Sequence, residues 1–400
     1  MKVNILRLDN FGRGIAYYNN KICFIYNALP DEIVEFEIIN ETKKYIEGVT
    51  KNIIKSSINR VEEKCIYSNY CGGCVFQNYS YKEENKFKED KIKNLVEKVL
   101  HIDRNIVKDI VYDKEFFYRN KLVLHGKNNC LGLYKNKSND IVDIDKCIIS
   151  NNKINSIIEK LKIIKGIEEV LIRTSNDEKS VIVDIKGSCN EYNSLIDLCD
   201  VLIVNNNLIS KNSKIITNIG DKKYYLSSNS FFQVNMFLVE KMFNKLREYV
   251  NILRPNSILD LYCGTGSFGI YVSDSITNIV GVDYNKANIR DAIDNSSLNN
   301  LDNINFICDK VENVIDQFKD YDLVIVDPPR SGLDKKTIEY LIKMSCKNII
   351  YISCDPNTLI RDLGYLNNDY VINEITPYNL FPRTYHVETV SVLCRKTVEK

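Results

Sequence analysis

The stretch SILDLYCGTGSFG, residues 257–269, consists of a short apolar run followed by a turn rich in glycine. Three further apolar runs follow it, at 278–283 (NIVGVD), 323–327 (LVIVD) and 348–353 (NIIYIS), and segments with helical periodicity separate them. Strands that are apolar along their whole length and alternate with helices are typical of a parallel sheet covered on both faces. The last third of the chain therefore predicts a Rossmann-like α/β domain with a mostly parallel sheet.

The glycine-rich turn predicts a site for a nucleoside ligand. Gly264 allows the backbone to come close to a ligand. Asp283 lies 23 residues after Asp260, at the end of the next run, where its carboxylate can accept both hydroxyls of a ribose. The pattern G-x-G-x-x-G is also satisfied, which leaves a nicotinamide dinucleotide as an alternative. The order Asp-x-Tyr-Cys-Gly-x-Gly and the motifs that follow favour S-adenosylmethionine.

Two of the following strand ends carry groups suited to chemistry on a base. Asp327 precedes Pro328-Pro329-Arg330, and two prolines in succession make a rigid turn that would fix the carboxylate at the sheet edge. There the carboxylate could accept the N3–H of a uracil. Cys354 ends the next run, in the order SCDP at 353–356, where a thiolate could act as a nucleophile.

Methylation of uracil at C5 would require both a nucleophile and a base. Addition of a thiolate at C6 produces an enolate, and C5 can then attack the methyl group of a sulfonium. A base must afterwards remove the C5 proton so that the thiolate can leave. We expect Glu388, within TYHVET at 384–389, to be this base, because partial desolvation raises the pKa of a carboxylate. His386 could orient Glu388 or contact RNA.

The remaining sequence predicts two further domains, because 400 residues exceed the size of one core. Residues 1–57 contain short alternating runs and predict an OB-like barrel of about five strands. Residues 58–220 contain a cysteine cluster, a helical segment at 81–100 and a mixed α/β segment. Basic and aromatic residues alternate between Lys114 and Lys135, which suits contacts with phosphates and bases, although a solvated sheet face is the plainer interpretation.

Composition restricts the location and the use of cysteine. The chain has a net charge of +1, and we find neither an apolar leader at its N-terminus nor a membrane-length apolar run. We therefore expect a cytoplasmic protein with no membrane partner. Its thirteen cysteines are odd in number, which argues against a disulfide framework and favours metal binding or catalysis. Cys65, Cys71 and Cys74 lie close together, and with a fourth thiolate they could bind zinc or an iron–sulfur cluster.

These motifs together resemble the RNA uracil-C5 methyltransferases, which form 5-methyluridine in 23S ribosomal RNA and in transfer RNA. The resemblance spans nearly the whole chain in the family's order. The residues that carry it are Cys65, Cys71, Cys74, Cys147, SFFQVN at 230–235, the turn at 260–269, DPPR at 327–330, SCDPN at 353–357 and HVET at 386–389.

The resemblance implies a TRAM domain at 1–57, a central iron–sulfur domain at 58–220 and a methyltransferase domain at 221–400. It implies that Cys354 is the nucleophile and Glu388 the proton acceptor. We expect the methyl donor to be bound by Gln233, Tyr262, Gly264, Ser267, Asp283, Asp309 and Asp327. We expect a [4Fe–4S] cluster to be bound by Cys65, Cys71, Cys74 and Cys147.

The resemblance also suggests a substrate. A TRAM domain together with a cluster favours 23S ribosomal RNA, because the transfer RNA enzymes of this kind commonly lack both; transfer RNA is the alternative. A protein that only binds RNA would not need Cys354 or Glu388. A methyltransferase acting on adenine or on protein would not need a cysteine nucleophile. The sequence indicates no obligate protein partner.

Overall fold

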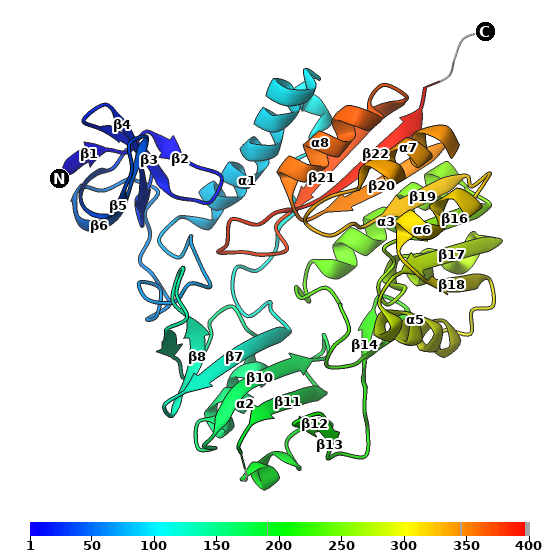
Figure 1. Ribbon diagram of the computed structural model, residues 1–400, viewed down its shortest axis with the longest axis horizontal. Coiled ribbons are helices and arrows are strands. Elements are labelled where there is room, and N and C mark those ends of the chain that lie inside the picture. Colours follow the sequence, from blue (N-terminus) through cyan, green and yellow to red (C-terminus); the bar gives the residue numbers. More distant parts are fainter. Residues whose placement is uncertain (190, 345, 397–400) are drawn as a thin grey trace.

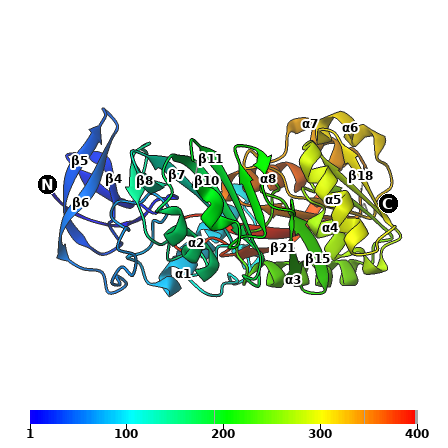
Figure 2. The same cartoon turned by 90° about the horizontal axis from the view of Figure 1, so that it is seen from below.

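The computed structural model of the protein describes residues 1–189, 191–344 and 346–396. Three large sheets and one small hairpin follow one another along the chain. The N-terminal sheet lies at one end of the molecule and the C-terminal sheet at the other, with the central sheet between them (Figures 1 and 2). In the part of the chain that the structure describes, no helix is long and apolar enough to cross a membrane.

The N-terminal sheet has the order β1-β5-β6-β4-β3-β2. Its strands are β1 (Lys2–Asn4), β2 (Arg7–Leu8), β3 (Gly14–Tyr18), β4 (Lys21–Tyr26), β5 (Ile33–Glu41) and β6 (Tyr45–Lys55). Only Ile5 and Leu6 separate β1 from β2, yet these strands lie at opposite ends of the order, so the sheet closes into a barrel. The amide of Ile5 donates to Glu32 O and that of Leu6 to Ile15 O, both over 2.9 Å. The expected barrel thus has five strands if β1 and β2 are counted as one. That strand is interrupted at Ile5 and Leu6, where it passes from its pairing with β5 to its pairing with β3.

Residues 56–80 connect the barrel to a helix. That helix, α1 (Tyr81–Leu95), continues into the π-helical turn η1 (Val96–Leu100), and a 3-10 turn, η2 (Arg104–Ile106), follows. Ile92 and Val96 are fully buried in the core of the C-terminal sheet, as their helical spacing suggests. Val99, which has the same spacing, is 54% exposed, because the π-helical turn changes the direction of its side chain.

The central sheet has the order β13-β12-β11-β10-β7-β8-β9. Its strands are β7 (Lys121–Lys127), β8 (Cys130–Tyr134), β9 (Ile141–Asp143), β10 (Ile167–Thr174), β11 (Val181–Gly187), β12 (Val201–Val204) and β13 (Asn207–Leu208). Helix α2 (Asn152–Leu161) packs on it through four buried apolar side chains, and the carboxamide of Asn151 caps the helix by accepting from Ile154 N over 2.9 Å. The 3-10 turn η3 (Tyr192–Leu195) and the hairpin β14 (Ile215–Ile219) and β15 (Lys222–Leu226) follow.

The C-terminal sheet has the order β18-β17-β16-β19-β20-β22-β21. Its strands are β16 (Ser257–Leu261), β17 (Asn278–Asp283), β18 (Ile304–Cys308), β19 (Leu323–Val326), β20 (Asn348–Ser353), β21 (Tyr370–Tyr378) and β22 (Glu388–Arg395). The first five are parallel, and β22 pairs antiparallel with both β20 and β21. The predicted mostly parallel sheet is therefore confirmed, with an antiparallel edge.

Helices cover both faces of this sheet. They are α3 (Val239–Leu253), α4 (Ser267–Tyr271), α5 (Lys286–Leu298), α6 (Val311–Val314), α7 (Lys335–Met344) and α8 (Pro356–Leu366), with 3-10 turns η4 (Ser273–Ser275) and η5 (Ile315–Gln317). Alternate strand residues enter different cores: Ile258 packs with α3 and α4, and Leu259 packs with α6, α7 and α8. Helix α1 covers the second face beside α8, so the segment before the central sheet stabilises the C-terminal one.

Candidate active site

The turn after β16 is open on the side where a ligand would lie. Gly264 has a φ of +55°, and no atom lies within 4 Å of the position that a Cβ would take, which leaves the backbone accessible. Its amide donates to Asp283 Oδ2 over 3.1 Å. The buried carboxylate of Asp260 accepts from Gly269 N over 3.1 Å, so that it holds the start of α4 against the strand. The turn is thus shaped by the two aspartates that the sequence singled out.

Asp283 is buried at the end of β17. Its Oδ1 accepts from Asn285 N over 2.7 Å and from Asn288 Nδ2 over 3.3 Å. These bonds fix the carboxylate at the carboxyl edge of the sheet, beside the open turn. Ligands of open α/β sheets bind at this edge.

The other residues predicted to bind the methyl donor differ in their surroundings. The hydroxyl of Tyr262 donates to Glu312 Oε1 over 3.2 Å, and Ser267 is the half-buried first residue of α4. Asp309 follows β18, and its Oδ1 accepts from Lys310 N and Asn313 Nδ2 over 2.7 and 2.8 Å. Gln233 is buried, and its backbone oxygen accepts from Asn120 Nδ2 of the central region over 3.3 Å.

The turn after β19 carries Asp327 beside the glycine-rich turn that follows β16. Its amide donates to Leu261 O over 3.3 Å, and the amide of Gly332 closes the turn by donating to Pro329 O over 2.8 Å. Gly332 has a φ of +76°, and a side chain there would collide with Asp362, which accepts from Leu333 N over 2.8 Å. The positive φ and these close contacts favour glycine at this position of the turn.

Cys354 and Glu388 lie at adjacent strand ends. Cys354 directly follows β20 and is half-buried, whereas Glu388 is the buried first residue of β22. Ser353 and Thr389 are partners in the antiparallel pairing of these strands. Continuing that register by one residue brings Cys354 and Glu388 opposite each other, so two residues 34 positions apart in the sequence share one site.

Burial and mutual repulsion shift the pKa values of these acids in one direction. Burial, and then the charge of Asp327, raises the pKa of Glu388 well above its usual range. Burial raises the pKa of the Cys354 thiol to about 11, with Glu388 and Asp327 adding to the effect and Arg330 opposing it. The pKa of Asp327 is raised by burial and by Asp260. A cation entering this site would therefore favour ionisation of all three groups.

His386 precedes Glu388 by two residues. Burial lowers the pKa of its imidazole to about 4, and the cations Arg330, Lys88 and Lys91 lower it further, while Asp355 acts in the opposite direction. His386 is therefore neutral near pH 7. Its ring lies beside Tyr385, with ring centroids 4.2 Å apart.

Sequence reasoning missed a buried network beneath the loop that leads to Glu388. Lys88 on α1 donates to Glu84 Oε1 over 2.8 Å, to Asn379 Oδ1 over 2.7 Å and to Phe381 O over 3.1 Å. Glu84 Oε1 also accepts from Arg383 N over 2.9 Å. No periodicity marks these residues, since α1 and the loop are nearly 300 positions apart in the chain.

The basic and aromatic segment between Lys114 and Lys135 is only partly a surface. Tyr118 is fully buried, and its hydroxyl donates to Pro382 O over 2.9 Å. Phe117 and Tyr134 are exposed, and Lys114 lies over the ring of Phe237, 4.2 Å from its centroid. The segment thus contributes to the core as well as to the exterior.

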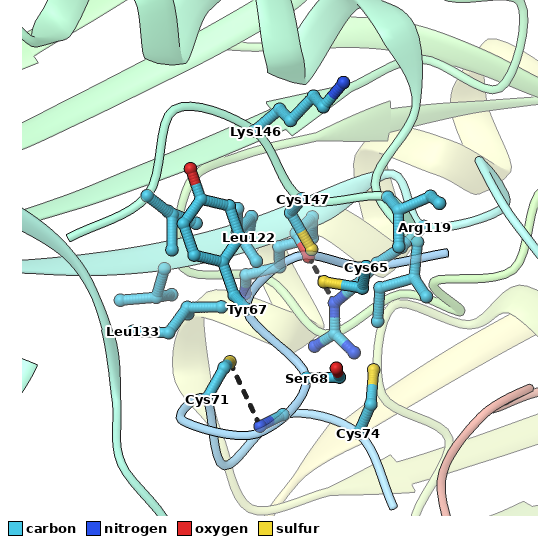
Figure 3. Close-up of a pocket in the computed structure, with 16 residues that line it drawn as sticks. Cys65, Tyr67, Ser68, Cys71, Cys74, Arg119, Leu122, Leu133, Lys146 and Cys147 are labelled. Carbon is cyan, nitrogen blue, oxygen red and sulfur yellow. Dashed lines mark hydrogen bonds between the residues drawn. The ribbon is translucent and has the colours of Figure 1, made fainter. Parts of the chain in front are cut away.

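The four predicted cluster ligands line one cavity of about 250 Å³ (Figure 3). Cys65, Cys71 and Cys74 come from one loop, and Cys147 comes from the segment after β9. Cys71 Sγ accepts from Gly73 N over 3.3 Å, and Gly72 N donates to Tyr134 O over 2.9 Å. Within the described ranges, no three His, Cys, Asp or Glu side chains are placed so that they could hold a metal ion. In the described residues, the four sulfurs are therefore not arranged around a single ion.

Comparisons with known proteins agree with this architecture. Residues 1–51 match the TRAM domain, and residues 201–396 match the tRNA (uracil-5-)-methyltransferase family. An uncharacterized RNA methyltransferase of Staphylococcus aureus is 32% identical, covering 97% of this chain and 96% of the relative. Another from Clostridium tetani is 34% identical, covering 96% and 93%.

One solved structure resembles the whole chain. The tRNA (uracil-54, C5)-methyltransferase of Pyrococcus abyssi, in complex with S-adenosyl-L-homocysteine, is 27% identical and has a TM-score of 0.81. The likeness covers 98% of this chain and 100% of that one. The bacterial RNA methyltransferases are about one third identical to this chain over nearly its full length. Together with this structural match, they show that the chain is an S-adenosylmethionine-dependent RNA methyltransferase of the RNA (uracil-5-)-methyltransferase family, with an N-terminal TRAM domain.

Proposed function

We propose that this enzyme methylates C5 of a uridine in RNA, with Cys354 as the nucleophile and Glu388 as the base, and we take 23S ribosomal RNA as the first candidate substrate. The observation that carries the proposal is the adjacency of these two residues at the ends of β20 and β22, beside Asp327 and the donor loop. A nucleophile and a base at one site are what C5 methylation of uracil requires. Asp327 is assigned to the N3–H of the uracil.

The methyl donor is assigned to the open edge at the glycine turn. Asp283 would accept the ribose hydroxyls, and Gly264 would let the nucleoside approach the backbone. Gln233, Tyr262, Ser267 and Asp309 complete the proposed donor site. The sulfonium of the bound methyl donor would bring a positive charge near Asp327 and Cys354, and this charge would lower the pKa of the Cys354 thiol. Donor binding thus promotes formation of the nucleophile.

The reaction then proceeds in three steps. The Cys354 thiolate forms a bond to C6, the π electron pair of the C5=C6 double bond moves to form a C4=C5 double bond, and the C4 carbonyl becomes an enolate oxygen. C5 attacks the methyl carbon, whose bond to sulfur breaks, so that S-adenosylhomocysteine leaves. Glu388 removes the C5 proton, the double bond reforms, and the thiolate departs from C6.

We assign Cys65, Cys71, Cys74 and Cys147 to a [4Fe–4S] cluster with a structural role. Four thiols line one cavity, and a [4Fe–4S] cluster takes one cysteine sulfur on each of its irons, while a zinc ion bound by four sulfurs is the alternative. Arg119, Lys121 and Lys146 also line the cavity, and these cations would balance thiolate charge. When bound, the cluster would join the loop of residues 65–74 to the central sheet.

Transfer RNA is the second candidate substrate. The expectation of 23S ribosomal RNA relied on transfer RNA enzymes lacking the additional domains. The Pyrococcus abyssi enzyme, which is described as acting on transfer RNA, nevertheless matches 98% of this chain. Domain content alone therefore does not separate the two substrates.

One experiment tests the reaction and the substrate together. Labelled S-adenosylmethionine is incubated with the enzyme and with either 23S or transfer RNA that lacks 5-methyluridine, and the nucleosides are then separated. Label in 5-methyluridine of 23S RNA supports the proposal, and label in transfer RNA alone selects the second candidate. Label in another nucleoside, or in neither RNA with donor bound, contradicts C5 methylation of these substrates.

A further inference from the structure

Aromatic rings connect the barrel to the loop that carries His386. Phe11 lies in the loop between β2 and β3, which reaches from the barrel towards the loop between β21 and β22 (Figure 1). The rings of Phe11 and Tyr385 meet edge to face with centroids 5.4 Å apart, and Tyr385 lies against His386 at 4.2 Å. His386 in turn meets Phe381 at 5.9 Å. Two distant domains thus form one aromatic row.

Phe11 is exposed, yet its backbone is held firmly. Its side chain is 54% exposed, whereas Asp9 Oδ1 accepts from both Phe11 N and Arg13 N, over 2.9 and 2.8 Å. Gly12 has a φ of +82° and lies so close to Phe76 that a Cβ would be only 2.7 Å from its ring. Lys91 on α1 donates to Asn10 O over 3.2 Å. A rigidly held aromatic ring outside the core is suited to binding.

His386, within this row, lies two residues before the proposed base Glu388, and several cations lie near the row. The charges of Arg330 and Asp355 act on His386, and these residues flank the proposed site of Asp327 and Cys354. Lys91 lies near Asp355, and the guanidinium of Arg13 lies 5.6 Å from the centroid of Phe11. Phe11 is exposed, whereas Tyr385 is half-buried against the cluster around Phe76. Accessible rings together with cations can bind single-stranded nucleic acid, since bases stack on rings and phosphates pair with cations.

We propose that Phe11 and Tyr385 form a stacking site for a nucleotide adjacent to the target uridine. The inference rests on the proposed function and adds to it a subsite shared by the TRAM barrel and the catalytic domain. A uridine that leaves its stack deprives the neighbouring base of a stacking partner. The ring of Phe11 replaces that partner, and the barrel thereby takes part in holding the RNA open at the active site.

The test uses RNA with 2-aminopurine, whose fluorescence is quenched by stacking, next to the target uridine. The RNA is whichever of 23S ribosomal RNA and transfer RNA the wild-type enzyme methylates. If the enzyme methylates neither of them, transfer RNA is used. The variants are Phe11→Leu and Tyr385→Leu, with Phe11→Tyr as the conservative change. Tyr17→Leu is the matched control, because Tyr17 is a 63% exposed aromatic residue on β3 of the same barrel. Each titration is paired with KM for RNA and kcat at saturating RNA.

We expect Phe11→Leu to weaken RNA binding about 5- to 100-fold, the effect of losing one stacked base, and to raise KM for RNA while kcat changes little. Tyr385→Leu should have the same effect, and Phe11→Tyr and Tyr17→Leu should bind as the wild type does. The inference is overturned if Phe11→Leu and Tyr385→Leu bind as tightly as Tyr17→Leu and leave the fluorescence unchanged. An inactive wild-type enzyme that still shows the Phe11-dependent fluorescence change would contradict the proposed function and not the stacking site.

Discussion

The hydroxyl of Thr389 donates a hydrogen bond to the backbone oxygen of Ser353 over 3.0 Å. This bond joins β20 to β22 at the last residue pair before the strands separate. The residues next to the pair are Cys354 and Glu388, so the antiparallel edge of the sheet brings a thiol and a buried carboxylate together. A purely parallel sheet would leave Cys354 without this neighbour.

Cys354→Ala should abolish methyl transfer, because no thiolate can then add to C6 of the uracil. Binding of S-adenosylmethionine should persist, since the donor loop at 260–269 is untouched. The measurement is turnover together with calorimetric donor binding. Cys130→Ala, which removes an exposed thiol on the central sheet, is the control and should leave turnover unchanged. Wild-type turnover in Cys354→Ala would exclude the thiolate mechanism.

Glu388→Gln should trap the enzyme on its RNA. Without a base the C5 proton stays in place, so Cys354 cannot be expelled from C6 after methyl transfer. A covalent protein–RNA band should accumulate on a denaturing gel. The double variant Cys354→Ala with Glu388→Gln should show no such band. Normal turnover in Glu388→Gln without an adduct would show that another group removes the proton.

Activity should rise with pH. The reaction needs the thiolate of Cys354, and burial raises the pKa of that thiol to about 11. At limiting donor, the thiolate fraction then increases up to about tenfold per pH unit below that value. Arg330→Met removes a cation that lowers this pKa, so its profile should shift to higher pH, while Arg330→Lys should stay closer to the wild type. Rates flat between pH 6 and 9 in the wild type would contradict this assignment.

Much of the C-terminal sheet could be predicted from local pattern. The runs at 278–283 and 348–353 are β17 and β20 to the residue, since strands buried on both faces must be apolar throughout. The carboxyl edge then followed from the parallel topology, and this topology brings Asp283, Asp327 and Cys354 to one side.

The contacts made across long separations could not be predicted in this way. The position of Glu388 depends on β22 inserting beside β20, and Lys88 reaches Asn379 across 291 positions. Such contacts depend on how helices and loops pack, and neither periodicity nor spacing encodes them. The exposure of Val99 could not be predicted either, because a π-helical turn interrupts the regular spacing of α1.

Glu84→Gln should destabilise the fold by about 3–5 kcal/mol, the usual effect of removing one partner of a buried ion pair. Lys88 is fully buried, and among the described residues Glu84 is the carboxylate with which it forms an ion pair, so the variant leaves a buried charge unpaired. The free energy of unfolding, measured with urea, gives the comparison. Lys93→Gln breaks the partly exposed pair with Glu89 on the same helix, and should cost only about 0.5 kcal/mol. Equal losses in the two variants would contradict a special role for the buried pair.

The cysteines that we assign to a cluster should affect catalysis from a distance. The amides of Val75 and Phe76, next to Cys74, both donate to Arg383 O, over 2.8 and 3.0 Å. Arg383 Nη1 in turn donates to Phe76 O over 2.8 Å, so the cysteine loop supports the loop that leads to Glu388. Cys74→Ser should therefore lower turnover as well as metal content. A shift of the base by about 1 Å would account for a loss of roughly 100-fold.

The decisive measurement is the iron, sulfide and zinc content of the purified protein, compared with turnover and donor binding. The wild type should contain iron and sulfide in equal amounts, near four of each per chain for a [4Fe–4S] cluster. Cys74→Ser should lose both while still binding the methyl donor, and Cys130→Ser should keep both, because Cys130 is exposed and does not line the cavity. One zinc per chain without sulfide would contradict the cluster and indicate a zinc site. Full turnover in metal-free Cys74→Ser would show that the loop of Glu388 keeps its position without support from the cysteine loop.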